Sequence, residues 1–292
     1  MSAPRKASDY SYFGPYDEAA FSAAYAEQFA KVPKFNQPSI PDLLFVLKKI
    51  GADSRINDIR WAAYLLGTTY VESSHTVKIT KVTQGKKGRA KTHQVKVWRN
   101  FAPIEEAGHG KGRKYYLPVK VTRLPSGDAR VVEYDGDTWT ISAHTGHSRA
   151  QNKHQERGVA ATASESEAYK NDEGDEQLYY GRGFVQLTWW SGYANAGVEL
   201  GRGLELLFDP DLVDERETAY QILATGMYTG KIYANGRTLA RYFHGSHTDY
   251  VGARDMVNPG AKHANKVEVA EIARRFEDVL FAARLKQAVA AG

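Results

Sequence analysis

Apolar residues recur at helical spacing near both ends of the chain, and between these regions they alternate with polar residues. Phe21, Tyr25 and Phe29 stand four residues apart, and Asp17 precedes them where it can cap a helix that runs to about Lys31. Further helices are predicted over residues 43–50, from Asp53 or Ser54 to about His75, and over 191–200, 215–228, 237–243, 250–257 and 265–289. The pattern therefore predicts a mainly α protein.

The central part of the chain has the two-residue period of β-strands. Strands are predicted within residues 77–98 and over 119–121, 129–134 and 138–142, with turn residues at 125–128 and 135–137. The stretch 144–176 is polar and rich in Ser, Glu and Asn, which is typical of a loop. We therefore expect a β-rich insertion over residues 76–178 in a helical protein.

Composition excludes several kinds of chemistry. The 292 residues include no cysteine, which excludes disulfides, thiolate metal sites and a cysteine nucleophile. The net charge of +5 favours contact with polyanions, either nucleic acid or an anionic bacterial cell wall. No apolar run approaches the roughly 20 residues that span a bilayer, and the N-terminus does not resemble a secretory signal peptide.

The positive charge is concentrated in one region. Residues 76–131 hold fourteen Lys and Arg but three Asp and Glu, so the rest of the chain is net acidic. This region is either a solvated β surface or an electrostatic docking surface for an anionic polymer. The sequence leaves both interpretations open.

The most informative segment runs from Tyr179 to Trp190. Gly181 and Gly183 flank Arg182, which suits a tight turn, and the apolar residues that follow suit a short strand or a buried segment. An amide, a hydroxyl and two tryptophans come next, and we expect the tryptophans to be exposed: Gln186, Thr188, Trp189 and Trp190. Aromatic faces beside neutral hydrogen-bonding groups are what a sugar-binding cleft needs. A glycine-rich turn that leads into a buried strand is the alternative.

The run Tyr-Gly-Arg-Gly-Phe-Val-Gln-Leu-Thr-Trp at 180–189 continues at Tyr193, Ala196 and Gly197. It resembles the cleft motif of family 19 glycoside hydrolases, which are the plant-type chitinases and the related phage and bacterial enzymes that cleave peptidoglycan. Residues 225–231, Leu239, Tyr242 and Phe243 extend the match. The resemblance covers residues 40–75, 101–116 and 179–285 and is closer to the phage endolysin branch.

The resemblance implies a lysozyme-like helical domain formed by residues 36–75 and 179–292. A helical extension over 1–35 would precede it. The basic, β-rich insertion over 76–178 would carry a segment, 101–116, that returns to the cleft. We expect a monomer that uses no cofactor and no metal.

Glu72 is the candidate general acid. It lies in a neutral helix of mostly small and apolar residues, where partial burial would keep a carboxylate protonated to higher pH. An ordinary glutamate at a helix end is the alternative. The segment is similar to the family's Ala-x-x-x-Glu-[Ser/Thr]-x-His, whose glutamate is the general acid, so the resemblance implies this role for Glu72.

Glu106 is the candidate general base. Residues 101–108 are similar to the endolysin Pro-Ile-x-Glu-Ala/Tyr segment, whose register matches Glu106 to the functional glutamate and Glu105 to a variable position. The resemblance implies an inverting mechanism, in which the base activates a water that Thr188 helps to hold. The alternatives are a solvated Glu-Glu pair, or Glu105 as the base.

The resemblance also implies a set of substrate-binding residues: Tyr180, Arg182, Gln186, Trp189, Tyr193 and Asn258. Asn258 has a second interpretation, as a left-handed turn residue before a proline. Gly192 departs from the family pattern, which commonly has an asparagine there. One substrate hydrogen bond is therefore missing, or Asn195 supplies it.

Histidines offer weaker signals. His144, His147 and His154 are a conceivable zinc set, but a polar loop without cysteine does not favour it. His75 follows Glu72 at the Glu-x-x-His spacing of some metal sites, but the second motif that such sites need is missing. We expect His75 to support the helix end or to orient Glu72.

The favoured hypothesis is a glycoside hydrolase that cleaves β-1,4 bonds in peptidoglycan or a related amino-sugar polymer by acid–base catalysis. A chitinase is the nearest alternative. The alternative of another class is a non-catalytic protein that binds cell wall or nucleic acid through its basic region. A wall enzyme made in the cytoplasm without a signal peptide would reach its substrate through a holin, a secretion system or a virion.

Overall fold

A computed structural model describes residues 5–32, 34–35, 39–84, 90–111, 113, 115, 117, 119–133, 136–147 and 175–285. Helices make up 47% of the structure and strands 19%, and the strands form small antiparallel sheets. The predicted combination of helices with a smaller β-rich part is therefore confirmed. The chain forms two compact units. The first contains Met1–Ala102, Phe243–Val251 and Lys262–Gly292, and the second contains Pro103–Tyr242 and Gly252–Ala261.

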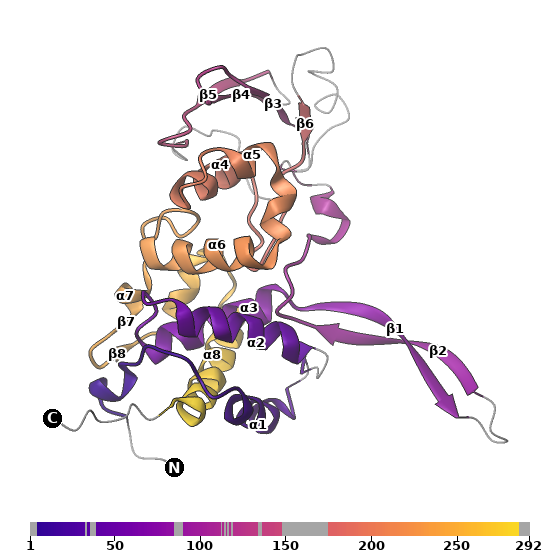
Figure 1. Ribbon diagram of the computed structural model, residues 1–292, viewed down its shortest axis with the longest axis vertical. Coiled ribbons are helices and arrows are strands. Elements are labelled where there is room, and N and C mark those ends of the chain that lie inside the picture. The colour runs from indigo at the N-terminus through magenta and orange to yellow at the C-terminus, as the bar shows by residue number, and fades with distance from the viewer. Residues whose placement is uncertain are drawn as a thin grey trace. The chain divides into compact units, whose positions relative to one another are not determined.

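The first unit combines helices with a long hairpin, which Figure 1 labels. Its helices are α1 Glu18–Phe29, α2 Ile40–Ala52, α3 Ile59–Glu72 and α8 His263–Ala283, with a 3-10 helix, η1 Ala7–Tyr10. Its strands are β1 His75–Gln84 with β2 Ala90–Arg99, and the short pair β7 Phe243–His244 with β8 His247–Thr248.

The core of this unit confirms the helix predicted after Asp17. The Asp17 carboxylate accepts the Ala20 N–H at 2.9 Å and caps α1. Tyr25 and Phe29 are fully buried, and the Phe29 ring lies 4.7 Å from the ring of Phe276 in α8. The aromatic stripe of α1 therefore packs on α8.

The helix that carries Glu72 differs at both ends from the prediction. A cap at 53–54 is wrong, because Asp58 caps α3 and accepts the Arg60 N–H at 2.8 Å. The helix ends at Glu72, and His75 is the first residue of β1. Glu72 is therefore the last helical residue before the hairpin.

In the part of the chain that the structure describes, the second unit contains a four-stranded antiparallel sheet and short helices. The strand order is β5-β4-β3-β6, with β3 Val119–Arg123, β4 Ala129–Val132, β5 Thr138–Ile141 and β6 Asp175–Gln177. The helices are α4 Trp190–Glu199, α5 Glu205–Phe208, α6 Arg216–Thr229 and α7 Leu239–Tyr242. The 3-10 helices are η3 Ala107–Gly110, η6 Pro210–Asp214 and η7 Gly252–Met256.

The sheet confirms the predicted strands and adds one. β3, β4 and β5 lie where the two-residue period predicts them. β6 lies at the end of the predicted loop and pairs with β3 through Gln177 and Val119. A strand of three residues is too short to show a period, so the sequence pattern misses it. Residues 148–174 of that predicted loop lie outside the described residues.

The helical predictions hold in part. The helices predicted over 191–200 and 215–228 correspond to α4 and α6. The prediction over 237–243 is too long, because Phe243 leaves α7 to pair with Thr248. The segment 250–257 forms a 3-10 helix, and α2 starts before residue 43 and continues through residue 51. None of the helices among the described residues is both long and apolar enough to cross a membrane.

Candidate active site

Residues 179–189 of the second unit form a tight loop, which we call the Gly-Arg-Gly loop. Arg182 and Leu187 exchange two backbone hydrogen bonds, at 3.2 and 2.9 Å, and the residues between them form turns and not a strand. Gly183 has a φ of +76°, and an added Cβ would lie 3.0 Å from the Val213 carbonyl oxygen. Both the conformation and the neighbouring chain therefore require glycine at 183.

Arg182 holds this loop together from inside. Its side chain is buried and donates to the Leu178 carbonyl at 2.9 Å, to the Tyr193 hydroxyl at 3.1 Å and to Asp211 at 2.9 Å. Its Cζ lies 3.7 Å from the centroid of the Tyr180 ring, a cation–π contact. The Tyr193 hydroxyl in turn donates to the Tyr180 carbonyl at 2.6 Å.

These contacts bear on the predicted substrate-binding roles of Arg182 and Tyr193. Both side chains are buried and use their polar groups within the loop. A side chain that binds a sugar must line an accessible surface. The contacts therefore favour a supporting role, and direct contact with substrate stays a prediction that requires the loop to open.

Glu106 is attached to the Gly-Arg-Gly loop at Gly181. Its N–H donates to the Gly181 carbonyl at 2.7 Å, and its Oε2 accepts the Gly181 N–H at 3.2 Å. Its Oε1 accepts the Tyr115 hydroxyl at 2.8 Å, and nearby Gln186 Nε2 donates to the Ile104 carbonyl at 2.9 Å. An added Cβ at Gly181 would lie 2.8 Å from Gln186 Oε1 and 3.2 Å from Glu106 Oε2. The missing side chain at 181 thus lets the carboxylate approach the backbone.

Glu105 has a different environment. It is exposed, accepts the Tyr180 hydroxyl at 2.7 Å and lies 3.2 Å from His109 Nε2. The Tyr180 ring stacks on the His109 ring at 4.5 Å. Burial, together with the hydrogen bond to Glu105, raises the pKa of Tyr180, so its hydroxyl stays a donor. Glu105 and Glu106 are therefore not an equivalent solvated pair, since Glu106 is half-buried and bound to the backbone.

Asp214 is a member of this cluster that the sequence analysis missed. Its Oδ1 accepts the Gly183 N–H at 3.0 Å, and its Oδ2 lies 3.5 Å from Arg182 Nε. Burial raises the pKa of Asp214 to about 6, although the Gly183 N–H and Arg182 both lower it. No motif marks this residue, because the fold alone brings the end of η6 to the loop.

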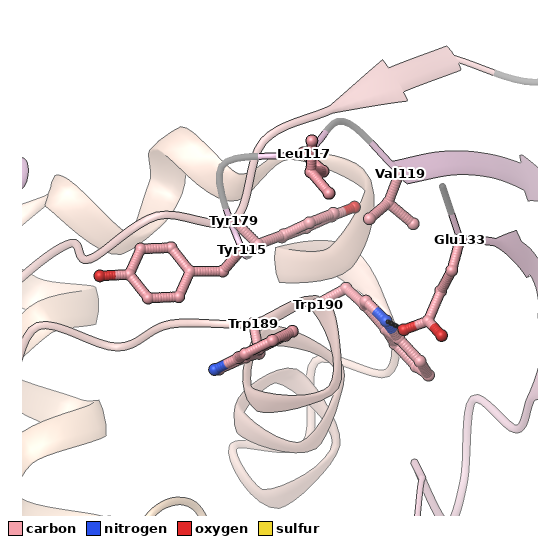
Figure 2. A pocket seen from close by; sticks show the side chains of 7 residues that line it. All are labelled: Tyr115, Leu117, Val119, Glu133, Tyr179, Trp189 and Trp190. Atoms are coloured by element: carbon pink, nitrogen blue, oxygen red, sulfur yellow. Dashed lines mark hydrogen bonds between the residues drawn. The ribbon is translucent and has the colours of Figure 1, made fainter. Parts of the chain in front are cut away.

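The two tryptophans are buried, so their predicted exposure is wrong. Trp190 is 1% exposed and donates its indole N–H to Glu133 at 2.6 Å, and Trp189 is 9% exposed. Glu133 is buried as well and also accepts the Trp139 indole N–H at 3.3 Å. Figure 2 shows Glu133 beside Trp190 at a small cavity, whose volume of about 10 Å³ suits one water and not a sugar. Substrate contact by Trp189 stays a prediction.

The side-chain amide of Asn195 already forms two hydrogen bonds within the second unit. Its Oδ1 accepts the His147 N–H at 2.8 Å, and its Nδ2 donates to the His147 carbonyl at 2.9 Å. Both ends of the amide thus hold the chain that follows β5. Asn195 therefore does not replace the side chain that Gly192 lacks.

Thr188 and Asn258 are both half-exposed residues of the second unit. Thr188 belongs to the Gly-Arg-Gly loop and precedes Trp189. Asn258 follows η7, where its carbonyl accepts the Ala261 N–H at 3.0 Å. It lies in a turn, but its φ is not positive, so a left-handed conformation is wrong. The role of Thr188 in holding water and that of Asn258 in substrate contact stay predictions.

Glu72 lies in the first unit and is half-buried at the end of α3. The hydroxyl of the next residue, Ser73, donates to the Thr69 carbonyl at 2.6 Å and accepts the Phe101 N–H at 2.7 Å. His75 Nδ1 lies 2.9 Å from the Ser73 carbonyl oxygen, so this histidine supports the helix end. The chain on either side of Glu72 is thereby fixed within its own unit.

The described residues hold no group of three or more His, Asp and Glu side chains that could bind a metal ion. His147 packs against the rings of Trp139 and Trp190, and burial lowers its pKa. His154 lies outside the described residues. No family model matches this chain, and no match was found among curated proteins or solved structures.

Proposed function

We propose that this chain is a glycoside hydrolase that cleaves β-1,4 bonds in peptidoglycan or a related amino-sugar polymer, through a lysozyme-like domain of the family 19 type. The observation that carries the proposal is the attachment of Glu106 to Gly181. Two of the segments that resemble the family, 101–116 and 179–189, meet at this contact although they are far apart in sequence. A carboxylate beside a glycine-rich loop is the arrangement that the resemblance requires of a base.

Glu106 acts as the general base. The Tyr115 hydroxyl and the Gly181 N–H use two of the roughly four acceptor positions of its carboxylate. They fix its orientation and leave positions that can accept a proton from water. Thr188 holds that water, which attacks the sugar from the face opposite the leaving group in an inverting reaction.

Glu72 acts as the general acid and protonates the glycosidic oxygen. It is half-buried at the end of a largely buried helix. The Ser73–Phe101 hydrogen bond keeps the backbone beside it in place.

Fragment release from purified sacculi tests these roles. Glu72→Gln and Glu106→Gln keep the size of the side chain and remove proton transfer, so each should lower turnover by about 10²–10⁴-fold. Glu105→Gln is the matched control and should keep most of the activity. Mass spectrometry of the fragments identifies the bond that is cut. Full activity of either Glu72→Gln or Glu106→Gln would contradict the role assigned to that residue.

Two other functions make different predictions. A chitinase would turn over chitin oligomers faster than sacculi. A non-catalytic binding protein is favoured by one observation, that Asn195 is engaged with His147 and Gly192 offers no side chain to a substrate. Such a protein would pellet with cell walls without releasing reducing ends, or would bind DNA with a steep salt dependence.

A further inference from the structure

The β1–β2 hairpin of the first unit is a long ribbon. Its strands pair without a break from His75 and Arg99 to Gln84 and Ala90, and Figure 1 shows them running outward from the helices of the same unit. At the usual rise of about 3.4 Å per residue, strands of ten residues give a ribbon of roughly 30 Å. A two-stranded hairpin alone is at best marginally stable in water, so a partner would stabilise it.

One face of the ribbon supplies part of that stability internally. Val77 stands opposite Val97, and Ile79 stands opposite Val95. All four side chains are half-exposed, and β-branched pairs of this kind stabilise a hairpin. The apolar pairs lie in the half of the ribbon nearest α3, and the outer half is exposed. The outer half is therefore available to a partner.

The charge of the hairpin is entirely of one sign. Residues 75–99 contain eight Lys and Arg and no Asp or Glu. Lys78, Lys81, Lys91 and Lys96 are exposed, and none of them forms an ion pair with a carboxylate among the residues that the structure describes. The ribbon therefore carries cations along its length without compensating anions of its own.

The strand register places two of these cations against each other. Lys78 stands directly opposite Lys96, and like charges in that position destabilise a hairpin. An anion between the two ammonium groups removes the repulsion and gains two charge-assisted hydrogen bonds. The pairing of the strands therefore favours an anionic partner more than an isolated lysine would.

We propose that this hairpin binds the phosphodiester polymers of a bacterial cell wall. The choice of partner rests on the proposed function, in which the protein acts on that wall. A flexible polyanion fits better than single-stranded nucleic acid, because bases bind by stacking on aromatic side chains. Residues 75–99 contain no Tyr or Phe and one Trp, Trp98, whose ring lies 5.7 Å from Lys34 Nζ at the base of the ribbon.

Pelleting with two preparations of the same Gram-positive sacculi tests the proposal. One preparation is intact, and hydrofluoric acid has removed the phosphodiester polymers from the other. The full chain is compared with Lys78→Gln/Lys81→Gln/Lys91→Gln/Lys96→Gln and with a control, Lys6→Gln/Lys31→Gln/Lys48→Gln/Lys262→Gln, whose four lysines are also exposed. Loss of four contacts to a flexible polyanion should reduce the slope of log affinity against log salt by roughly three.

The expected result is that the hairpin variant binds intact sacculi weakly, whereas the control binds like the wild type. Removal of the phosphodiester polymers should weaken sacculus binding by the wild type and by the control to the level that the hairpin variant shows on intact sacculi. Equal binding of the two variants to intact sacculi would overturn the proposal, as would undiminished binding of the wild type to stripped sacculi. Tighter binding to duplex DNA than to intact sacculi at the same salt would also overturn it and would identify nucleic acid as the partner.

A separate measurement keeps this proposal distinct from the proposed function. Hydrolysis of soluble amino-sugar oligomers needs no wall polymer, so the hairpin variant should match the wild-type rate. If no form of the protein cleaves the oligomers, the proposed function fails, and sacculus binding still reports on the hairpin. Circular dichroism then establishes that the variant is folded.

Discussion

Two tyrosine hydroxyls hold two adjacent glutamates in the second unit. Tyr115 donates to Glu106 at 2.8 Å, and Tyr180 donates to Glu105 at 2.7 Å. The bonds are alike in length but not in setting, because Glu106 is half-buried and also binds the Gly181 N–H, whereas Glu105 is exposed. A hydrogen bond contributes more where water competes less for the groups that form it. The Tyr115 bond is therefore the more important one for orienting a carboxylate.

Replacing each tyrosine by phenylalanine tests which glutamate is the base. Tyr115→Phe should lower kcat about tenfold or more with little change in KM, since a hydrogen bond to a charged group contributes about 1.5–3 kcal/mol. Tyr180→Phe is the matched control and should leave kcat nearly unchanged. Steady-state kinetics on soluble amino-sugar oligomers supply the comparison. A larger loss of kcat in Tyr180→Phe would assign the base to Glu105.

At the scale of elements, η6 and the Gly-Arg-Gly loop are joined through Asp214 and Gly183. The Gly183 N–H donates to Asp214, which is 24% exposed in its side chain and has a pKa raised by burial to about 6. Arg182, which lies beside Asp214, also donates to Asp211, whose side chain is 78% exposed. The contact between the two elements therefore includes one largely buried carboxyl, that of Asp214, and one exposed carboxyl, that of Asp211.

The stability of the folded chain should fall as pH rises, because the buried Asp214 carboxyl ionises. A carboxyl whose pKa is higher in the folded chain than in the unfolded one stabilises the fold below the unfolded value, near 4, and loses that effect as pH rises through about 6. The loss for the wild type should amount to roughly 1–3 kcal/mol between pH 4 and pH 7. Asp214→Asn should remove this part of the pH dependence, and Asp211→Asn should retain it. Urea unfolding at several pH values measures it, and an unchanged profile in Asp214→Asn would show that another group is responsible.

Local patterns in the sequence predict some elements well and cannot predict others. The stripe of Tyr25 and Phe29 predicts α1 because an amphipathic helix shows its period directly. The first residue of α3 is not predicted in the same way, because Asp53, Ser54 and Asp58 are all of residue types that can cap a helix. Asp58 is the actual cap, and it also forms an ion pair with the buried Arg60. The burial of Trp190 depends on Glu133, which lies on another element and is far away in sequence. Contacts of that kind leave no local signal.

At the scale of the whole molecule, one stretch of two-residue period contributes to both compact units. The hairpin at 75–99 belongs to the first unit, and the strands from 119 onward belong to the second. Apolar and polar residues alternate in a similar way along both parts of the sequence. The pattern therefore predicts strands but carries no information on which unit they join. The positive charge of residues 76–131 is likewise divided between the two units.

In the proposed mechanism Glu72 is the acid and Glu106 is the base, and the stereochemistry of the product tests the reaction of the whole molecule. A base that activates water requires carboxyl groups roughly 6.5–9.5 Å apart and inverts the β-linkage, so the α anomer forms first. A retaining enzyme has carboxyl groups about 5–5.5 Å apart and releases the β anomer. Proton NMR during the first minutes of oligomer cleavage distinguishes the two before mutarotation mixes them. Release of the β anomer would contradict a general-base role for Glu106, because retention requires a nucleophile at the anomeric carbon.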